Sequence, residues 1–222
     1  MSDITQVSRF GFVNCYLVRE DDGLTLVDTM LGGSARKILA AADDLGAPIK
    51  RIALTHAHGD HIGSLDALAE ALPGVDVIIS TRDARLLVKD VTLDPGEPQD
   101  KIRGSVSGAK TAPTRTVTAG DRVGSLEVVA SPGHTPGHIA FLDTRDRTLI
   151  CGDAYTTLGG VATTAKGRPL FPLAAMATWH KPTELESAKA LRALDPTRLA
   201  PGHGKIVDNP GPEMDAAIAR GV

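Results

Sequence analysis

Short apolar runs alternate with stretches of helical periodicity along the 222-residue chain. Runs rich in Val, Ile and Leu that are bounded by Gly, Pro or Asp are typical of strands, and apolar residues at i, i+3 and i+4 are typical of helices. Strands are predicted at 12–18, 24–28, 52–54, 75–79, 126–130, 139–142, 148–151 and 198–200. Helices are predicted at 35–45, 64–72, 82–88, 183–194 and, as a short closing helix, after Asn209.

Two stretches interrupt this pattern. Residues 89–115 contain several Pro and Gly and no strong periodicity, which predicts a long connector between two halves of the chain. Residues 155–182 are also irregular. Two predicted helices carry capping signals: Ser34 is expected to cap the helix at 35–45, and Thr183 the helix that follows residue 182.

Composition is that of an ordinary globular protein, with 42% hydrophobic and 23% charged residues. We expect a single domain over residues 1–222. The net charge of −3 and the lack of a basic block give no reason to expect a nucleic-acid partner. No apolar segment is long enough to cross a bilayer, and residues 1–4 do not resemble a signal peptide, so we expect a cytoplasmic protein without a membrane partner. The two cysteines, Cys15 and Cys151, are too few for a disulfide framework.

The densest chemical signal is the stretch Thr55-His56-Ala57-His58-Gly59-Asp60-His61. It follows an apolar run and precedes a helical pattern, so it should form a strand end, a short loop and a helix N-terminus. Side chains at i and i+2 of an extended backbone point the same way, and His56 and His58 can therefore chelate one ion. Asp60 and His61, beyond the turn at Gly59, can face a second position. The alternative is a solvated His-rich loop that holds no metal.

Three further polar residues each follow a glycine near the end of a predicted strand: His134, Asp153 and His203. Glycine before a polar residue lets the backbone turn and present the side chain in a cleft. Taken singly, each of them is explained as well by a loop contact. Together with the His-rich stretch they indicate a metal site, since imidazole and carboxylate are ligands that Zn²⁺ and similar ions take.

These motifs, in this order between residues 14 and 204, resemble those of the metallo-β-lactamase superfamily. The resemblance implies an α/β fold, an αββα sandwich of two mixed β-sheets with helices on the outer faces. It implies that His56, His58 and His134 hold one metal, that Asp60, His61 and His203 hold a second, and that Asp153 bridges the two. In the motif Gly-His-Thr-Pro-Gly-His, the second histidine, His138, resembles a structural position. His180 matches no family position and is expected to be a loop histidine.

Two divalent ions about 4 Å apart can share a water and lower its pKa towards neutrality, which yields a hydroxide nucleophile. Asp60 can hold the proton of that hydroxide or pass it to a leaving group. We therefore expect a dinuclear metal-dependent hydrolase. Zn is the expected metal, and Mn or Fe suits the same ligands.

The substrate class depends on finer resemblances. The motifs are similar to those of glyoxalase II, a thioester hydrolase, although nineteen residues after His203 leave no room for the helical extension of that enzyme. Acyl-homoserine lactonases share the ligand set and use a tyrosine after the bridging aspartate, which makes Tyr155 a candidate catalytic residue. These resemblances imply an ester, thioester or lactone as the small-molecule substrate. The open alternatives are a mononuclear iron oxidoreductase of persulfide dioxygenase type, a β-lactamase-like or phosphodiesterase hydrolase, and a catalytically idle scaffold.

Aromatic residues are scarce, yet Tyr155, Phe171 and Trp179 all lie in or at the edge of the irregular segment after Asp153. We expect this segment to form a pocket wall against an apolar, acyl-like part of the substrate. The alternative is a surface loop or a dimer contact, and a homodimer stays open.

Overall fold

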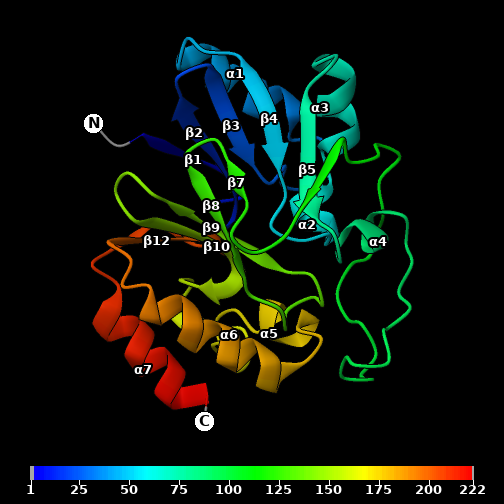
Figure 1. The fold of residues 1–222 in the computed structure, drawn as a ribbon. Helices are drawn as coiled ribbons and strands as arrows, with labels where there is room; N and C mark the ends of the chain where they lie inside the picture. The colour runs from blue at the N-terminus through cyan, green and yellow to red at the C-terminus, as the bar shows by residue number, and fades with distance from the viewer. Residues whose placement is uncertain (1–2, 222) are drawn as a thin grey trace.

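Two β-sheets face each other, and helices cover both outer faces (Figure 1). The structure is a computed structural model that describes residues 3–221. Both sheets mix parallel and antiparallel neighbours. The predicted fold class, a sandwich of two mixed sheets between helical layers, is confirmed.

The first sheet is built from the N-terminal half of the chain, in the order β1-β2-β3-β4-β5-β6. Its strands are β1 Ile4–Arg9, β2 Val13–Glu20, β3 Gly23–Val27, β4 Ile49–Ala53, β5 Asp76–Ser80 and β6 Arg115–Val117. The helices of this half are α1 Ala35–Asp44, α2 Gly59–Ile62, α3 Leu65–Ala71 and α4 Ala84–Leu87.

The second sheet follows in the order β13-β12-β10-β9-β8-β7, and β11 pairs with β10. Its strands are β7 Arg122–Val123, β8 Leu126–Ala130, β9 Ile139–Asp143, β10 Thr148–Thr156, β11 Ala162–Thr163, β12 Arg198–His203 and β13 Val207–Asp208. The helices α5 Leu173–Ala177, α6 Lys181–Ala193 and α7 Gly211–Gly221 lie on its outer side (Figure 1).

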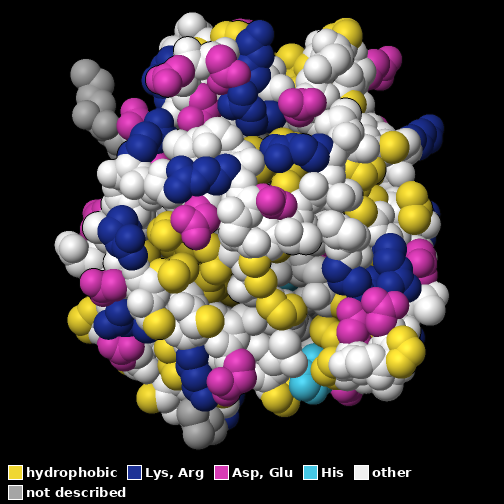
Figure 2. Space-filling model, in the orientation of Figure 1, with side chains coloured by type: hydrophobic (Ala, Val, Ile, Leu, Met, Phe, Trp, Pro, Cys, Tyr) yellow, Lys and Arg dark blue, Asp and Glu magenta, His cyan; other side chains and the backbone are white. Residues whose placement is uncertain are grey.

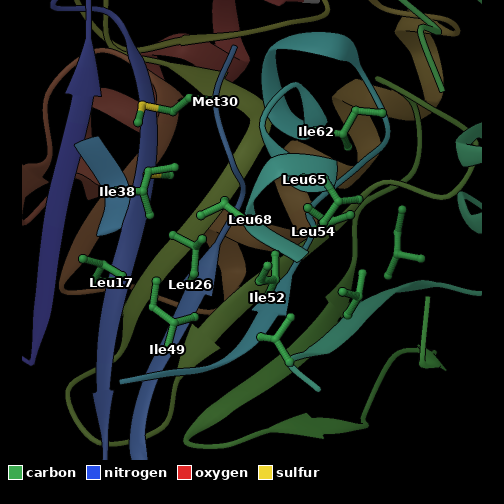
Figure 3. Close-up of a cluster of buried hydrophobic side chains, with 14 of the residues drawn as sticks. Leu17, Leu26, Met30, Ile38, Ile49, Ile52, Leu54, Ile62, Leu65 and Leu68 are labelled. Atoms are coloured by element: carbon green, nitrogen blue, oxygen red, sulfur yellow. The ribbon is translucent and has the colours of Figure 1, made fainter. Parts of the chain in front are cut away.

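Strand β2 shows why the sandwich forms. Its side chains alternate between two faces, so Cys15 and Leu17 pack under the helices, whereas Tyr16 and Val18 enter the layer between the sheets. A strand that is buried on both faces must be apolar almost throughout. Figure 3 shows the first of these layers, where side chains of β2–β4 meet those of α1 and α3.

The third apolar layer lies between the second sheet and the last helices. Leu149 of β10 and Leu199 of β12 pack there with Leu191 of α6 and Met214 of α7. Three layers of apolar side chains thus support the two sheets. Over the face seen in Figure 2, basic and acidic side chains are interspersed rather than grouped in a block of one sign.

The pattern did not predict β1, β6, β7, β11, β13 or α5. Most of these elements are two to five residues long, too short to show a periodicity. The longer strand β1 carries only two buried residues, at Ile4 and Val7, because it pairs with β2 alone at the edge of its sheet.

The prediction that Thr183 caps α6 is wrong. His180 is the N-cap, and its side chain accepts a hydrogen bond from the backbone N–H of Thr183. Lys181 and Pro182 already belong to the helix, because proline suits the first turn, where its missing N–H costs nothing. Ser34 stands at the N-cap of α1 as expected, but its hydroxyl donates to the carbonyl of Leu31 instead of capping.

Within residues 3–221, no helix combines the length and the apolar character that crossing a bilayer requires.

Candidate metal centre

Seven predicted ligands, from four separate segments of the chain, meet at one end of the sandwich. His56 and His58 lie in the loop after β4, and Asp60 and His61 lie on α2, which begins directly after that loop. The remaining ligands come from the second half: His134 from the β8–β9 loop, Asp153 from β10 and His203 from the end of β12. His58 has the extended backbone that the i, i+2 argument requires.

The ligand atoms form three groups in which all atoms lie within 4.8 Å of one another: His56 with His58 and His134, Asp60 with His61 and His203, and His56 with His61 and Asp153. The first two groups are the triads that the family resemblance implies. The carboxylate of Asp153 lies between them, with Oδ2 3.4 Å from His134 Nε2 and 3.2 Å from His203 Nε2.

The outer ring nitrogen of each ligand histidine is held by a hydrogen bond. His58 Nε2 lies 2.9 Å from the carbonyl oxygen of Arg103, and His203 Nδ1 lies 3.0 Å from that of Phe12. Carbonyl oxygens only accept, so these nitrogens carry a proton, and the opposite nitrogen of each ring faces the centre, where a metal could bind it. The other three contacts are His56 Nδ1 to Thr55 Oγ1 (3.0 Å), His61 Nδ1 to Asp28 Oδ2 (2.8 Å) and His134 Nδ1 to Thr178 Oγ1 (3.0 Å).

The threonine contacts have the same direction. Thr55 Oγ1 donates its proton to Asp28 Oδ2 at 2.8 Å, so it accepts from His56 Nδ1. Thr178 Oγ1 lies 3.0 Å from the carbonyl oxygen of Thr164 and accepts from His134 in the same way. Hydrogen bonds of this kind fix the tautomer and the ring orientation of a metal-ligating histidine.

The inward-facing atoms fit a metal. Three of them, His56 Nε2, His61 Nε2 and Asp153 Oδ1, are buried without a hydrogen-bond partner. Lone pairs also face each other at His58 Nδ1 and His134 Nε2, which are 3.0 Å apart. Neighbouring ligands of a tetrahedral Zn²⁺ ion are separated by about 3.3 Å. Bare acceptors at this spacing need a cation between them.

Charge differs between the two triads. Burial, helped by the other imidazoles, lowers the pKa of His56 well below its usual value, so this ring is neutral. Burial also acts to lower the pKa of His203, but the carboxylate of Asp153 outweighs it and raises that pKa to about 9. The pKa of Asp153 is held well below its usual range by His203 and His61, against the effect of burial. A metal at the second triad would therefore replace protons.

Asp28 is a functional residue that the sequence pattern treated only as a strand end. It accepts from the N–H of Thr55 at 2.8 Å and from the hydroxyl of Thr55, and it holds His61. Its φ of +62° is one that aspartate tolerates better than most residues. The available signal was a carboxylate directly after a buried strand, as at Asp153.

Asp83 was also missed, and it joins the two histidine loops. Its buried carboxylate accepts from the N–H groups of Ala57 and Gly137 and from the hydroxyl of Thr135. Burial raises its pKa to about 6, although these hydrogen bonds oppose the rise. Nothing local in the sequence points to this role, because Asp83 lies 52 residues from Thr135.

Residues 89–115, predicted to be a connector between two halves, form part of the site. The carbonyl of Arg103 orients His58, and the carbonyl of Ser105 accepts from the N–H of Gly59 at 2.8 Å. Gly104 permits this approach, because a Cβ there would lie 2.4 Å from His58 Nε2.

A cavity of about 750 Å³ opens over the ligands. Ser105 and Ser107 lie on one side, and Phe171, Leu173 and Ala174 on another. The predicted wall formed by residues 155–182 is thus present, with Phe171 as its aromatic member.

Tyr155 does not lie in this wall. Its side chain is buried in the layer beneath α6, where its hydroxyl donates to the carbonyl of Ala188 at 2.7 Å. The proposal that Tyr155 is catalytic is corrected accordingly. Regular alternation would place Tyr155 on the same face as Asp153, but the register of β10 shifts between Gly152 and Thr156, and Tyr155 points into the core instead of the cavity. Trp179 is buried too, and its indole N–H donates to the carbonyl of Asp100 at 2.7 Å.

The two other histidines serve the framework. His138 Nδ1 lies 2.8 Å from Ser131 Oγ, and its Nε2 accepts from the N–H of Asp153 at 3.1 Å. Both of its nitrogens are thereby occupied, and burial lowers its pKa to about 3. His180 caps α6 and lies outside the ligand groups.

Comparison with known proteins agrees with this geometry. Residues 8–203 match the family model described as the metallo-β-lactamase superfamily. The chain is 46% identical to the uncharacterized protein YobT of Bacillus subtilis over 209 aligned residues. This alignment covers 94% of this chain and 90% of that protein. It is 34% identical over 163 residues to a hydroxyacylglutathione hydrolase of Rhodospirillum rubrum, covering 71% of this chain but only 53%, about half, of that enzyme.

Solved structures have the same fold. The BLEG-1 B3 metallo-β-lactamase superposes with a TM-score of 0.71 at 23% identity, over 96% of both chains. TTHA1623, solved in a di-iron-bound form, superposes with a TM-score of 0.67 at 28% identity, over 93% of this chain and 94% of that one. With two triads of oriented ligands at the end of an αββα sandwich, and with these relatives, the chain belongs to the metallo-β-lactamase superfamily and is a metal-dependent hydrolase.

Proposed function

We propose that the chain hydrolyses an ester, thioester or lactone with two divalent metal ions. His56, His58 and His134 would hold the first ion, Asp60, His61 and His203 would hold the second, and the carboxylate of Asp153, which lies between the two triads, could serve both. One observation carries this proposal: all five ligand histidines have their outer nitrogen fixed as a donor, so five inward-facing ring nitrogens and two carboxylates converge.

When bound, divalent ions supply Lewis-acid polarisation of a carbonyl oxygen and lower the pKa of water towards neutrality. The protein's own contribution to proton transfer is Asp60. Its side chain, 32% exposed, lines the cavity and lies 3.3 Å from His203 Nε2. Burial acts to raise its pKa, but the hydrogen bond from His203 and the charge of His61 hold it well below the usual range. A divalent ion in place of these protons would also keep Asp60 ionised, and its carboxylate can then accept a proton from water and pass it to the leaving group.

The cavity supports a small-molecule substrate. Its volume of about 750 Å³ lies in the usual range for ligand pockets. The thioester option is supported by the hydroxyacylglutathione hydrolase relative. We propose zinc as the metal, and the di-iron form of TTHA1623 makes iron the first alternative to test.

The test combines metal analysis with a substrate panel. We expect two metal ions per chain and hydrolysis of at least one p-nitrophenyl ester, thioester or lactone, lost on chelation and restored by adding metal back. Asp60→Asn should lower kcat by about 10²- to 10⁴-fold, the range for a general acid–base. As a matched control, Asp43→Asn, on the far end of α1, should leave kcat unchanged.

Other results on the same panel would contradict the proposal. One iron per chain with oxygen consumption would favour the oxidoreductase reading instead. Hydrolysis confined to bis-p-nitrophenyl phosphate would indicate a phosphodiester substrate, and hydrolysis confined to nitrocefin would indicate a β-lactam. Metal-loaded protein that is inactive on every compound would favour a catalytically idle scaffold.

A further inference from the structure

An apolar groove runs beside the metal cavity. It is lined by Phe12, Leu158, Gly159, Leu170, Phe171 and Leu173 and has a volume of about 440 Å³. Phe12, Phe171 and Leu173 line both the groove and the metal cavity, so the two spaces are continuous.

The groove begins at a ligand. The ring of Phe171 lies 4.9 Å from that of His203, and Phe12 lies 6.0 Å from Phe171. The carbonyl of Phe12 in turn accepts from His203 Nδ1. A substrate whose reacting carbonyl sits at the ligands can therefore extend directly along these rings.

The outer part of the groove is unusually exposed. Leu170 is 84% exposed and Leu173 60%, and neither is part of a core cluster. Leu170 lies across Gly159, where an added Cβ would be 3.1 Å from its Cδ1. Large apolar side chains grouped beside a reaction centre mark a binding surface more often than isolated exposed residues do.

Charge restricts the occupant further. Among the described residues that line the groove and the metal cavity, none is lysine or arginine, and the charged ones besides the ligands amount to Asp66. An anionic arm, such as a peptide carboxylate or a phosphate, finds no cation there to pair with. An uncharged apolar arm needs none.

We infer that the groove binds the uncharged, linear acyl chain of the substrate. This inference rests on the proposed hydrolase function and narrows it to esters, thioesters or lactones of medium-length aliphatic acids. Leu170 and Leu173 determine the preference for chain length, because they extend the apolar wall away from the metal ligands.

The test compares p-nitrophenyl esters from acetyl to decanoyl on the metal-loaded, full-length protein. Burial of one CH₂ is worth about 0.8 kcal/mol, so kcat/KM should rise by up to about fourfold for each CH₂ that enters the groove. In Leu170→Ser/Leu173→Ser this rise should flatten. Val91→Ser, an exposed apolar residue that lines neither space, is the matched control and should keep the wild-type slope.

Binding gives a readout that does not depend on turnover. An uncharged dansyl amide with a decyl chain should bind the wild type and Val91→Ser, and bind the double variant at least about tenfold more weakly. Equal slopes for the wild type and the double variant, or a wild type without any slope, would overturn the inference.

Two outcomes separate the groove from its alternatives. If no ester of the series and no thioester or lactone with the same acyl chains is turned over, the proposed function fails, while loss of probe binding in the double variant still supports an apolar ligand site. If sedimentation shows a dimer that dissociates in the double variant without a change in slope, the groove is a subunit interface and the inference is overturned.

Discussion

Asp28 illustrates how a residue outside the ligand set can govern the site. Its carboxylate holds His61 directly and His56 through Thr55, so one side chain orients a histidine in each triad. Partners of this kind set both ring orientation and ligand basicity.

Asp28→Asn should therefore weaken metal binding by about 10- to 100-fold. An amide can donate to His61 Nδ1 as well as accept, which permits the wrong tautomer. Competition with a chromophoric chelator measures the affinity. Asp22→Asn, which removes an exposed carboxylate paired with Arg51, is the control and should leave metal affinity unchanged. An Asp28→Asn protein with wild-type affinity would contradict the role of Asp28.

Glu184 is a buried carboxyl group without a basic partner among the described residues. Burial raises its pKa from 4.5 to about 8, and the nearby N–H groups of Ala165 and Thr164 only partly oppose this. Because the folded-state pKa is the higher one, the folded protein loses stability as pH rises from about 4.5 to 8 and no more above that.

Glu184→Gln removes this titration. The variant should be more stable than the wild type by up to about 5 kcal/mol at pH 8, and the difference should shrink towards zero near pH 4.5. Urea unfolding at several pH values measures it. Glu186→Gln, two residues further along α6 and exposed, should show no such pH-dependent gain. A constant difference between Glu184→Gln and the wild type would refute the raised pKa.

At the scale of elements, residues 89–115 act as a clamp over the first triad. Their backbone carbonyls contact His58 and Trp179, at Arg103 and Asp100 respectively. The far end of the segment is fixed by Asp66, which accepts from the N–H groups of Lys110 and Thr111. Hydrogen bonds to backbone atoms do not depend on side-chain type, so the sequence pattern of this segment gave no sign of them.

Gly104→Ala tests the clamp. The new Cβ would collide with His58 Nε2, so the segment or the ring must move and metal affinity should fall by at least about tenfold. Gly74→Ala is a matched control, since its φ of +81° is close to the +80° of Gly104 and nothing lies within 4 Å of its Cβ position.

Both variants should lose about 1–2 kcal/mol of stability from backbone strain alone. Isothermal titration with Zn²⁺ separates this shared loss from the affinity change expected only in Gly104→Ala. Equal affinities would show that the clamp does not position His58.

At the scale of the whole molecule, the ligands tie the two sheets together. His58 and His61 belong to the N-terminal half, whereas His134, Asp153 and His203 belong to the second sheet and its loops. Metal binding at this junction is therefore coupled to the stability of the entire sandwich.

Chelation should lower the unfolding temperature. Ligand present at about a thousandfold excess over its Kd stabilises by about 4 kcal/mol, which corresponds to about 10 °C for a chain of this size. Scanning calorimetry with and without chelator measures the shift. In His58→Ala/His203→Ala the shift should be largely abolished. An unchanged transition in protein verified to contain metal would contradict the coupling.

The sequence by itself determined the longer strands and helices, and its motifs indicated the candidate ligands. Strands buried on both faces, such as β2 and β10, can be predicted because burial on both faces favours a nearly continuous apolar run. The ligands were readable because His56 to His61 are adjacent in the chain and the later ones each follow a glycine. These signals are local, and the packing of the two sheets does not alter them.

Tertiary structure alone decided which residues surround those ligands. His203 donates to the carbonyl of Phe12, 191 positions away, and Asp83 joins two loops from which it is separated by 26 residues at Ala57 and 52 residues at Thr135. Tyr155, two residues from Asp153, turned into the core instead of the cavity. Such contacts arise only when the sheets pack face to face, because that packing decides which backbone carbonyls and side chains meet. The separation of two residues along the chain does not predict whether they will be in contact.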